Sequence, residues 1–329
     1  MPDNPIARRV ITIPAVLALL AVVTVASPAL LVIGAIVDLA RLAVTRRRGM
    51  VLRSLAFLWI YLVGEAWALL ALLGTSVLAG HKKLDATYAL QDRWAAWNLT
   101  ALRLLFSVEV RVTGENHARP GPIIVLSRHA SLVDTLLPAR FIARANGMRL
   151  RYVLKKELLI DPALDIAGSR LPNVFVDRAA KEAAERQSIK RLAEDLGPRD
   201  GVLIYPEGTR FDEAKLRRHQ RRHPRADPGS IEHLTSRYRR VLPPRPGGTL
   251  ALLEASDADV LVFAHRGLEG LATVRDIWRG DLVGSTIDLA MWRVARADIP
   301  HSRAERVEWL FRLWADVDEW VRSDHEKTS

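Results

Sequence analysis

The chain has 329 residues, with 48 Lys and Arg against 37 Asp and Glu, so its formal net charge is +11. Hydrophobic residues make up 49% of it, which is enough for a sizeable core and excludes a wholly disordered chain. The absence of cysteine excludes disulfide scaffolds, thiolate nucleophiles, cysteine zinc sites and iron–sulfur clusters. This length predicts one large domain with an appendage, or two modest domains.

The N-terminal part contains two long apolar segments. Residues 10–37 carry no charged side chain, and residues 54–80 carry only Glu65. About 20 apolar residues suffice to cross a bilayer, so we expect a two-helix membrane hairpin. Two alternatives stay open: a signal peptide, whose apolar core has only about 7–15 residues, and a soluble pair of buried helices, because Pro14 and Pro28 interrupt the first segment.

Five arginines lie between or beside the two apolar segments. They are Arg41, Arg46, Arg47, Arg48 and Arg53. Positive charge favours the cytoplasmic side of a membrane, and the rest of the chain is also basic. A hairpin that fully spans the bilayer would separate the arginines from the rest of the chain, whereas a shallow, re-entrant hairpin would keep both in the cytoplasm. The second arrangement is a hypothesis, and both stay open. We expect the chain at the cell membrane with the remaining domain on the cytoplasmic side.

The excess positive charge is concentrated in one further stretch. Residues 1–85 hold nine basic and four acidic side chains, which leaves +6 for the remainder of the chain. Residues 210–245 hold eleven basic and four acidic side chains, a net +7. This stretch is either a solvated loop or a contact for anionic groups.

Beyond the hairpin of residues 1–85, we expect an α/β domain over residues 86–329. Its strands are predicted at 108–112, 123–126, 202–205 and 260–263, its helices at 92–105, 132–146, 180–196 and 302–322, and a polar connector at 81–87. The first strand alternates apolar and polar residues, and the other three are continuous apolar runs, typical of strands that are covered on both faces. Strands that alternate with helices predict a mixed sheet flanked by helices.

The helix predicted at 302–322 is amphipathic. Ser302 and Glu305 form a capping box at its start. Its tryptophans, Trp309, Trp314 and Trp320, allow a membrane-surface role, but anionic lipid would repel its acidic side chains. We therefore expect a packed closing helix.

A histidine and an aspartate follow the apolar strand at 123–126. His129 and Asp134 are five residues apart, which would hold their side chains apart on an ideal helix. They meet if His129 lies in the turn after the strand and Asp134 in the opening turn of the next helix. Asp134 then accepts a hydrogen bond from one ring nitrogen, and the other nitrogen can remove a hydroxyl proton.

A second group of polar residues follows the apolar run at 202–205. Glu207 is followed by Gly208, which lets backbone approach a ligand closely, by Thr209, which can donate hydrogen bonds, and by Arg210, whose planar fork suits phosphate. An ordinary turn with a surface arginine is the open alternative. A third piece is Arg178, which follows the short apolar run at 174–176.

Together these pieces resemble the glycerolipid acyltransferases, often called the lysophosphatidic acid acyltransferase family. His129 and Asp134 match the first motif of this family, Phe175 and Arg178 the second, and 207–210, read as Glu-Gly-Thr-Arg, the third. The order and the spacing of the motifs agree with the family, and residues 155–158 look like its usual segment between the first two. The fourth motif departs from the usual pattern, because residues 241–247 look more like the branch with long-chain and lysocardiolipin acyltransferases.

The resemblance implies an O-acyltransferase that moves a fatty acyl group from a thioester to the hydroxyl of a lysophospholipid. The implied acceptor is 1-acylglycerol-3-phosphate and the product is phosphatidic acid. The implied catalytic residues are His129 and Asp134, and the implied phosphate-binding residues are Glu207, Gly208, Thr209, Arg210 and Arg178. We expect no bound cofactor and no metal. Acyl-CoA or acyl carrier protein is the expected co-substrate, and the bilayer and the lysophospholipid are the expected partners.

Three rival functions use the same residues differently. A phospholipid transacylase keeps the constellation but takes its acyl chain from another phospholipid. A membrane-tethered nucleic-acid-binding protein would use the arginine-rich stretch, but the sequence lacks aromatic-interleaved or helix-turn-helix signatures, so we expect no nucleic acid partner. A hydrolase is disfavoured because the sequence contains no Gly-x-Ser-x-Gly elbow around Ser131 or elsewhere.

Overall fold

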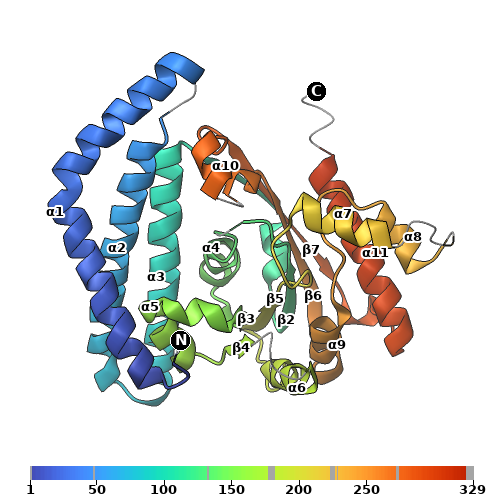
Figure 1. Cartoon of the computed structure of the whole chain (residues 1–329). Coiled ribbons are helices and arrows are strands. Elements are labelled where there is room, and N and C mark those ends of the chain that lie inside the picture. The colour runs from blue at the N-terminus through green and yellow to red at the C-terminus, as the bar shows by residue number, and fades with distance from the viewer. Residues whose placement is uncertain are drawn as a thin grey trace.

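A computed structural model of the chain describes residues 2–46, 49–131, 133–176, 182–222, 227, 229–271 and 274–323. A seven-stranded sheet with the order β1-β7-β6-β2-β5-β3-β4 lies at its centre (Figure 1). The strands are β1 (Glu109–Thr113), β2 (Ile123–Ser127), β3 (Arg149–Lys155), β4 (Val174–Val176), β5 (Asp200–Ile204), β6 (Asp259–Arg266) and β7 (Thr286–Val294). The β6–β7 pair is antiparallel and the other neighbours are parallel, which confirms the predicted mixed sheet.

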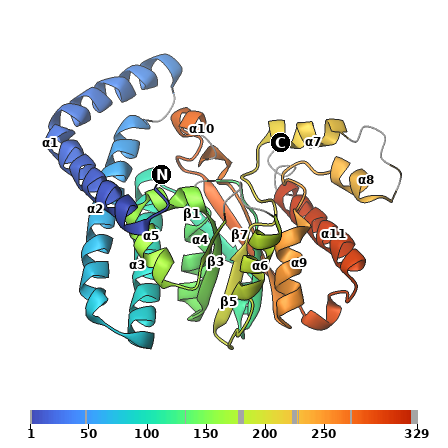
Figure 2. The same cartoon turned by 60° about the horizontal axis from the view of Figure 1, so that its bottom comes forward.

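Helices cover both faces of the sheet, which explains the continuous apolar strands. In β2, Ile123 and Val125 belong to one buried cluster, and Ile124 and Leu126 belong to the other. The first cluster includes residues of α3 (Gly80–Phe106) and of the short segments α4 (Leu136–Pro138) and η3 (Ala139–Arg144). The second includes residues of α6 (Glu182–Leu192), α9 (Pro246–Ala255) and α11 (Arg303–Arg322) (Figure 2).

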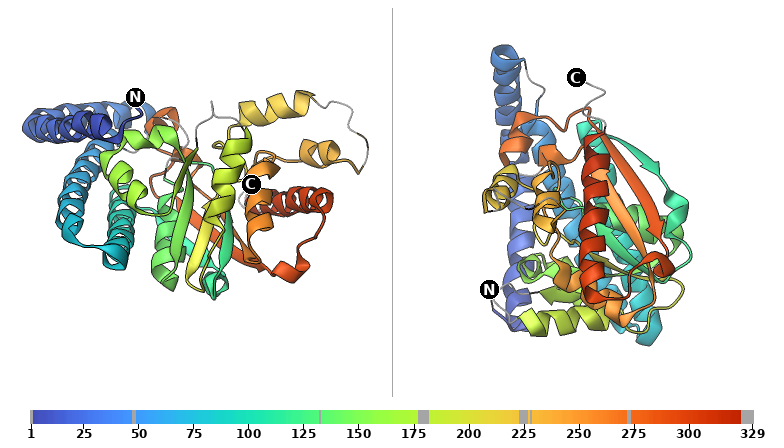
Figure 3. Two further views of the ribbon diagram at one scale, coloured as in Figure 1. Left: turned by 90° about the horizontal axis from the view of Figure 1, so that it is seen from below. Right: turned by 90° about the vertical axis from the view of Figure 1, so that its right-hand side faces the viewer.

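Two helices, α1 (Pro5–Thr45) and α2 (Val51–Gly74), form an N-terminal hairpin beside this domain (Figures 1 and 3). Both are long and apolar enough to cross a membrane, over Pro5–Val44 and Val51–Val77. The hairpin packs through α2 against α3 and against α5 (Pro162–Arg170). At about 1.5 Å per residue, the 41 residues of α1 reach about 60 Å, twice the hydrocarbon thickness of about 30 Å.

Both ends of α1 contact elements outside the hairpin. Near its start, the guanidinium of Arg8 contacts the buried carboxylate of Asp165 in α5 through two hydrogen bonds, at 2.9 and 2.8 Å. Near its end, the guanidinium of Arg41 lies 4.2 Å from the ring centre of Trp278 in α10 (Val274–Arg279). Between these contacts, α1 packs mainly against α2.

The remaining helical elements are short. They are α7 (Glu213–Arg222), α8 (Ile231–Ser236), η1 (Thr75–Val77), η2 (Glu115–Ala118), η4 (Lys156–Ile160), η5 (Glu269–Leu271) and η6 (Arg296–Asp298). The predicted capping box is confirmed, because the Ser302 hydroxyl and the Glu305 carboxylate bond each other and the Glu305 amide donates to Ser302. Trp314 of α11 is fully buried, as a closing helix requires.

One local prediction is wrong. The polar connector expected at 81–87 is part of α3, because its charged residues occupy the exposed side of that helix while Thr87 and Leu90 are buried. Residue 85 thus lies inside a helix, and the division of the chain there into two folding units stays a prediction. Strands β3 and β7 were not predicted at all, and β4 was noted only as a short apolar run.

Candidate active site

His129 and Asp134 lie together after the carboxyl end of β2. The Nδ1 atom of His129 is 3.0 Å from Oδ2 of Asp134, although five residues separate them in sequence. The chain turns tightly here, because the Asp134 carboxylate also accepts hydrogen bonds from the amides of Ala130 and Ser131 and from the Ser131 hydroxyl. Ser131 thus holds the carboxylate, and Leu132 lies outside the described residues.

The environment of this pair favours a neutral imidazole beside a charged carboxylate. Burial alone would raise the pKa of Asp134, but the neighbouring imidazoles of His265 and His129 hold that pKa well below its usual value. Burial lowers the pKa of His129, against the opposite effect of Asp134. Because a carboxylate only accepts, Nδ1 of His129 carries the proton and Nε2 keeps a lone pair, as a general base requires.

Glu207 joins the loop after β5 to the loop after β2. Its Oε1 accepts from the amide of His129 at 3.0 Å, and its Oε2 accepts from the amide of Leu242 at 2.9 Å. The amide of Phe211 donates back to the His129 carbonyl at 2.7 Å. Burial raises the pKa of Glu207 to about 8, despite these two hydrogen bonds. Its carboxyl group therefore orients the loops around His129.

Gly208 makes the next turn possible. Its φ of +66° lies in the left-handed region that favours glycine, and its amide donates to the carbonyl of Tyr205. A Cβ at this position would lie 3.0 Å from the side chain of Arg245. Only a residue without a side chain thus lets Arg245 pass so close to the backbone.

Cationic side chains surround the same turn. The ammonium of Lys215 donates to the Thr209 hydroxyl at 3.0 Å and to the carbonyl of Arg210 at 3.1 Å, which fixes the start of α7 against the motif. One face of α7 lines the same cavity as His129 through residues at helical spacing, namely Lys215, Arg218, His219 and Arg222. Lys155 and Arg245 line it as well. The predicted residue Arg178, and Arg225 of the basic stretch, lie outside the described residues.

Sequence reasoning missed three side chains at this site. Tyr205 packs against His129 with ring centres 4.5 Å apart, and Lys155 helps to lower the His129 pKa. Tyr205 closes a predicted strand, so its position was the available signal. Lys155 and Arg245 belong to the segments 155–158 and 241–247 that were compared with the family, but only the fold places Arg245 beside Gly208.

A single cavity of about 1580 Å³ connects these groups with an apolar region. Its polar end is formed by His129, the turn at 207–210 and α7. Its other end lies among α2, α3 and α5, where it is lined by Leu58, Leu72, Leu90, Trp94, Phe106 and Leu164. Among the described residues, no group of three or more His, Asp or Glu side chains is arranged to hold a metal ion.

Comparisons with known proteins agree with this geometry. The acyltransferase family profile matches residues 109–260, which contain His129, Asp134 and the turn at 207–210. These comparisons support the glycerolipid acyltransferase family for residues 109–260.

Two relatives illustrate the family. A 1-acyl-sn-glycerol-3-phosphate acyltransferase from Pseudomonas aeruginosa is 30% identical over 120 residues, which cover 36% of this chain and 45% of the relative. The match thus spans less than half of that protein. The crystal structure of a 1-acyl-sn-glycerophosphate acyltransferase from Thermotoga maritima superposes with a TM-score of 0.54 at 17% identity, over 85% of this chain and 95% of that one. The second similarity shows a shared fold.

Proposed function

We propose that this protein is a membrane-bound O-acyltransferase. It transfers a fatty acyl group from a thioester to the free hydroxyl of a lysophospholipid, with 1-acylglycerol-3-phosphate as acceptor and phosphatidic acid as product. One observation carries the proposal: a partly buried imidazole with a lowered pKa lies in one cavity between cationic side chains and an apolar region between helices. An acyl chain fits the apolar region and a phosphate fits the cationic end.

The proposed chemistry needs no acyl-enzyme intermediate. The Nε2 atom of His129 takes the proton of the acceptor hydroxyl as its oxygen attacks the thioester carbonyl. Asp134 keeps the ring in the required tautomer and stabilises the imidazolium that forms. The tetrahedral intermediate collapses, the carbon–sulfur bond breaks, and the thiolate leaves and is protonated. The new ester stays on the acceptor.

The cationic groups divide naturally between two substrates. Arg210, with Thr209 and the backbone around Gly208, suits the phosphate of the acceptor, because the amide of the next residue, Phe211, donates to the His129 carbonyl and so holds this turn beside His129. The inward face of α7 lies further along the chain and suits the phosphates of a coenzyme A donor. An acidic carrier protein would instead meet the outward face of α7, where Arg217 and Arg221 are exposed.

The hairpin is the proposed membrane anchor. Apolar side chains of α1 are exposed along its length, among them Val10, Val25 and Val44. Arg8 near the start of α1 and Arg41 near its end both contact the domain beside the hairpin. This supports a re-entrant hairpin whose basic loop and catalytic domain share the cytoplasmic side.

The decisive experiment is an acyl-transfer assay with the purified full-length protein in mixed micelles. Oleoyl-CoA and a panel of lysophospholipids are supplied, and both thiol release and diacylated product are measured. We expect phosphatidic acid with one thiol released per ester formed. Product without acyl-CoA would identify a transacylase, and thiol release without product would identify a hydrolase. The absence of product from every acceptor with either acyl-CoA or acyl carrier protein would overturn the proposal.

A further inference from the structure

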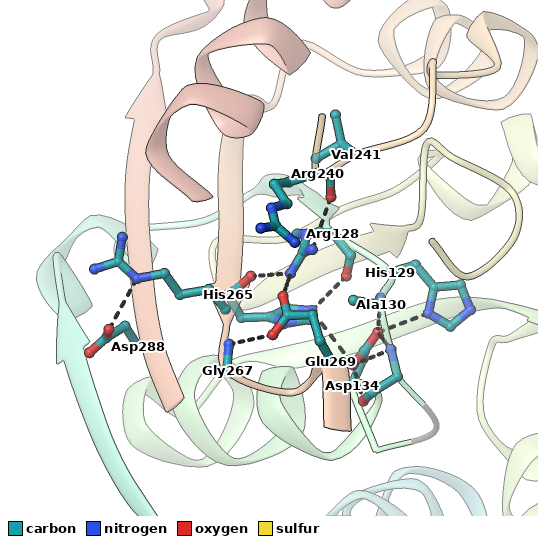
Figure 4. A network of polar contacts seen from close by, with 12 residues as sticks. Arg128, His129, Ala130, Asp134, Arg240, Val241, His265, Gly267, Glu269 and Asp288 are labelled. Atoms are coloured by element: carbon teal, nitrogen blue, oxygen red, sulfur yellow. Dashed lines mark hydrogen bonds and ion pairs between the residues drawn. The ribbon is translucent and has the colours of Figure 1, made fainter. Parts of the chain in front are cut away.

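A second histidine lies on the far side of Asp134 from His129. His265, in β6, has no exposed surface, and it is 136 residues from His129 in sequence. Its Nε2 atom is 3.0 Å from the carbonyl oxygen of Arg128 and 3.6 Å from Oδ1 of Asp134. Figure 4 shows the side chain between Arg128 and Asp134, with the His129 ring beyond the carboxylate.

The contacts of His265 determine where its proton lies. A carbonyl oxygen only accepts, so Nε2 must carry a hydrogen. The Nδ1 atom has no hydrogen-bond partner among the described residues, which is tolerable for a lone pair and costly for a buried N–H. The neutral tautomer with hydrogen on Nε2 therefore fits, and that hydrogen is donated to the Arg128 carbonyl, with the Asp134 carboxylate next to it at 3.6 Å.

The surroundings of His265 are held rigidly. The fully buried guanidinium of Arg128 donates from Nη1 to the carbonyl of His265 at 2.7 Å and to Oε1 of Glu269 at 2.9 Å. Its Nη2 donates to the carbonyl of Arg240 at 2.9 Å. Glu269 also accepts from the amide of Gly267 at 2.8 Å. The ends of β2 and β6 and the loop at residue 240 are thus joined around one buried ion pair, as Figure 4 shows.

The two oxygens of Asp134 consequently have different neighbours. Oδ2 contacts the ring of His129, and Oδ1 accepts from the Ser131 hydroxyl and faces His265. The same Nε2–H group binds the carbonyl that immediately precedes His129 in the chain. One donor therefore contacts both the backbone and the carboxylate that orient the catalytic ring.

We propose that His265 is a positioning residue for the acyl transfer, whose Nε2–H group fixes the Arg128 carbonyl and Oδ1 of Asp134 so that Oδ2 stays turned toward His129. The inference rests on the proposed function, and it adds a residue outside the sequence motifs. His265 acts through Asp134 and does not line the cavity with His129.

Two amide variants test the proposal. In His265→Gln the amide nitrogen reaches about as far as Nε2, so the donor is kept, whereas in His265→Asn it is too short. We expect kcat to fall about tenfold in the asparagine variant, the size of one lost hydrogen bond, with both KM values within about twofold. The glutamine variant should recover most of kcat. Equal kcat values for wild type and the asparagine variant would overturn the inference.

A purely structural role would lower activity only through stability, so stability is measured alongside. Val262→Ala shortens a buried side chain of β6 that packs into the cluster on the other face of the sheet. We expect this control to lower the Tm about as much as His265→Asn and to leave kcat unchanged. If kcat falls equally in the control, His265 has no positioning role.

A titration of His129 gives a readout that does not depend on turnover. The charged or titratable groups around His265 are Arg128, Glu269, Asp134 and, beyond it, His129; those around His129 also include Lys155, Tyr205 and Glu207. Without the His265 donor, Asp134 becomes a stronger acceptor and retains the imidazolium proton to higher pH. We expect histidine NMR to show a higher His129 pKa in His265→Asn and a normal one in His265→Gln. An unchanged His129 titration in both variants refutes the positioning role, whether or not wild type transfers an acyl group. A lack of acyl transfer by wild type would refute only the proposed function.

Discussion

Oε1 of Glu207 accepts a hydrogen bond from the backbone amide of His129, 78 residues away in the sequence and 3.0 Å away in space. This contact links the third motif of the family directly to the first. The carboxyl group has almost no exposed surface, so it acts on the loops and not on solvent. Its effect should therefore appear in stability as well as in activity.

Glu207 should make stability depend on pH. Its pKa is about 8 in the folded protein against the ordinary value of 4.5, so the folded state binds more protons than the unfolded state between these limits. The free energy of unfolding should therefore fall as pH rises from about 5 to about 8. In Glu207→Gln this contribution disappears, and the difference in Tm between pH 5 and pH 8 should become smaller. A larger difference in Tm between pH 5 and pH 8 in the variant than in wild type would contradict the burial effect. Asp134 does not contribute to this difference, because its lowered pKa lies outside the interval.

His129→Ala should abolish turnover without abolishing binding. General bases typically contribute about 10²–10⁴ in rate, so kcat should fall by that factor while the KM for the acceptor stays within a few-fold. In the wild-type enzyme, the lowered pKa of His129 predicts that the acid limb of the kcat/KM profile lies below 6.5, the ordinary histidine value. Steady-state assays over pH measure both effects. A fully active alanine variant would exclude the mechanism.

Arg210→Ala should mainly weaken acceptor binding. A charge-assisted hydrogen bond contributes about 1.5–3 kcal/mol, so the acceptor KM should rise roughly 10- to 100-fold with a smaller change in kcat. Arg210→Lys keeps the charge but loses the planar fork, and it should fall between wild type and alanine. If the KM for the thioester rises instead, Arg210 belongs to the donor site.

Substitutions on the two faces of α7 should distinguish acyl-CoA from acyl carrier protein as the acyl donor. Arg218→Gln with Arg222→Gln removes two charges that line the cavity, and Arg217→Gln with Arg221→Gln removes two from the exposed face. We expect only the first pair to raise the KM for acyl-CoA. If the second pair raises the KM for acyl carrier protein more than the first pair raises the KM for acyl-CoA, acyl carrier protein is the donor.

The topology of the hairpin is testable with a single cysteine, because the chain has none of its own. Arg46→Cys marks the end of α1, and Asp257→Cys marks an almost fully exposed carboxylate of the catalytic domain. For a re-entrant hairpin, a membrane-impermeant maleimide should label both positions only after the cells are opened. Labelling of position 46 in intact cells would instead show a hairpin that fully spans.

The sheet was partly readable in the sequence. Apolar runs revealed β2 and β5 because both faces of these strands are buried. Strands β3 and β7 were overlooked although Leu150 and Leu154, or Ile287 and Leu289, alternate with less buried residues. The helical nature of residues 81–87 was hidden because solvent-facing helix residues and loop residues have the same polar composition.

The meeting of His129 with Asp134 and the turn at 207–210 were predictable for a different reason. Their residues are close together in the chain, so spacing alone restricts where they lie. His265 and Arg245 reach the site only because β6 pairs with β2 and because residues 241–245 cross the turn at Gly208. Such long-range neighbours depend on strand order, which composition and periodicity do not encode.

The contacts of α1 at Arg8 and Arg41 have a consequence for the proposed reaction at a membrane. Because both ends of α1 contact the domain, the hairpin and the domain should move together. The depth at which the hairpin inserts would then set the height of the His129 ring relative to the phosphate plane. Turnover should respond to bilayer thickness, because a thicker leaflet raises the acceptor's hydroxyl while the His129 ring keeps its height.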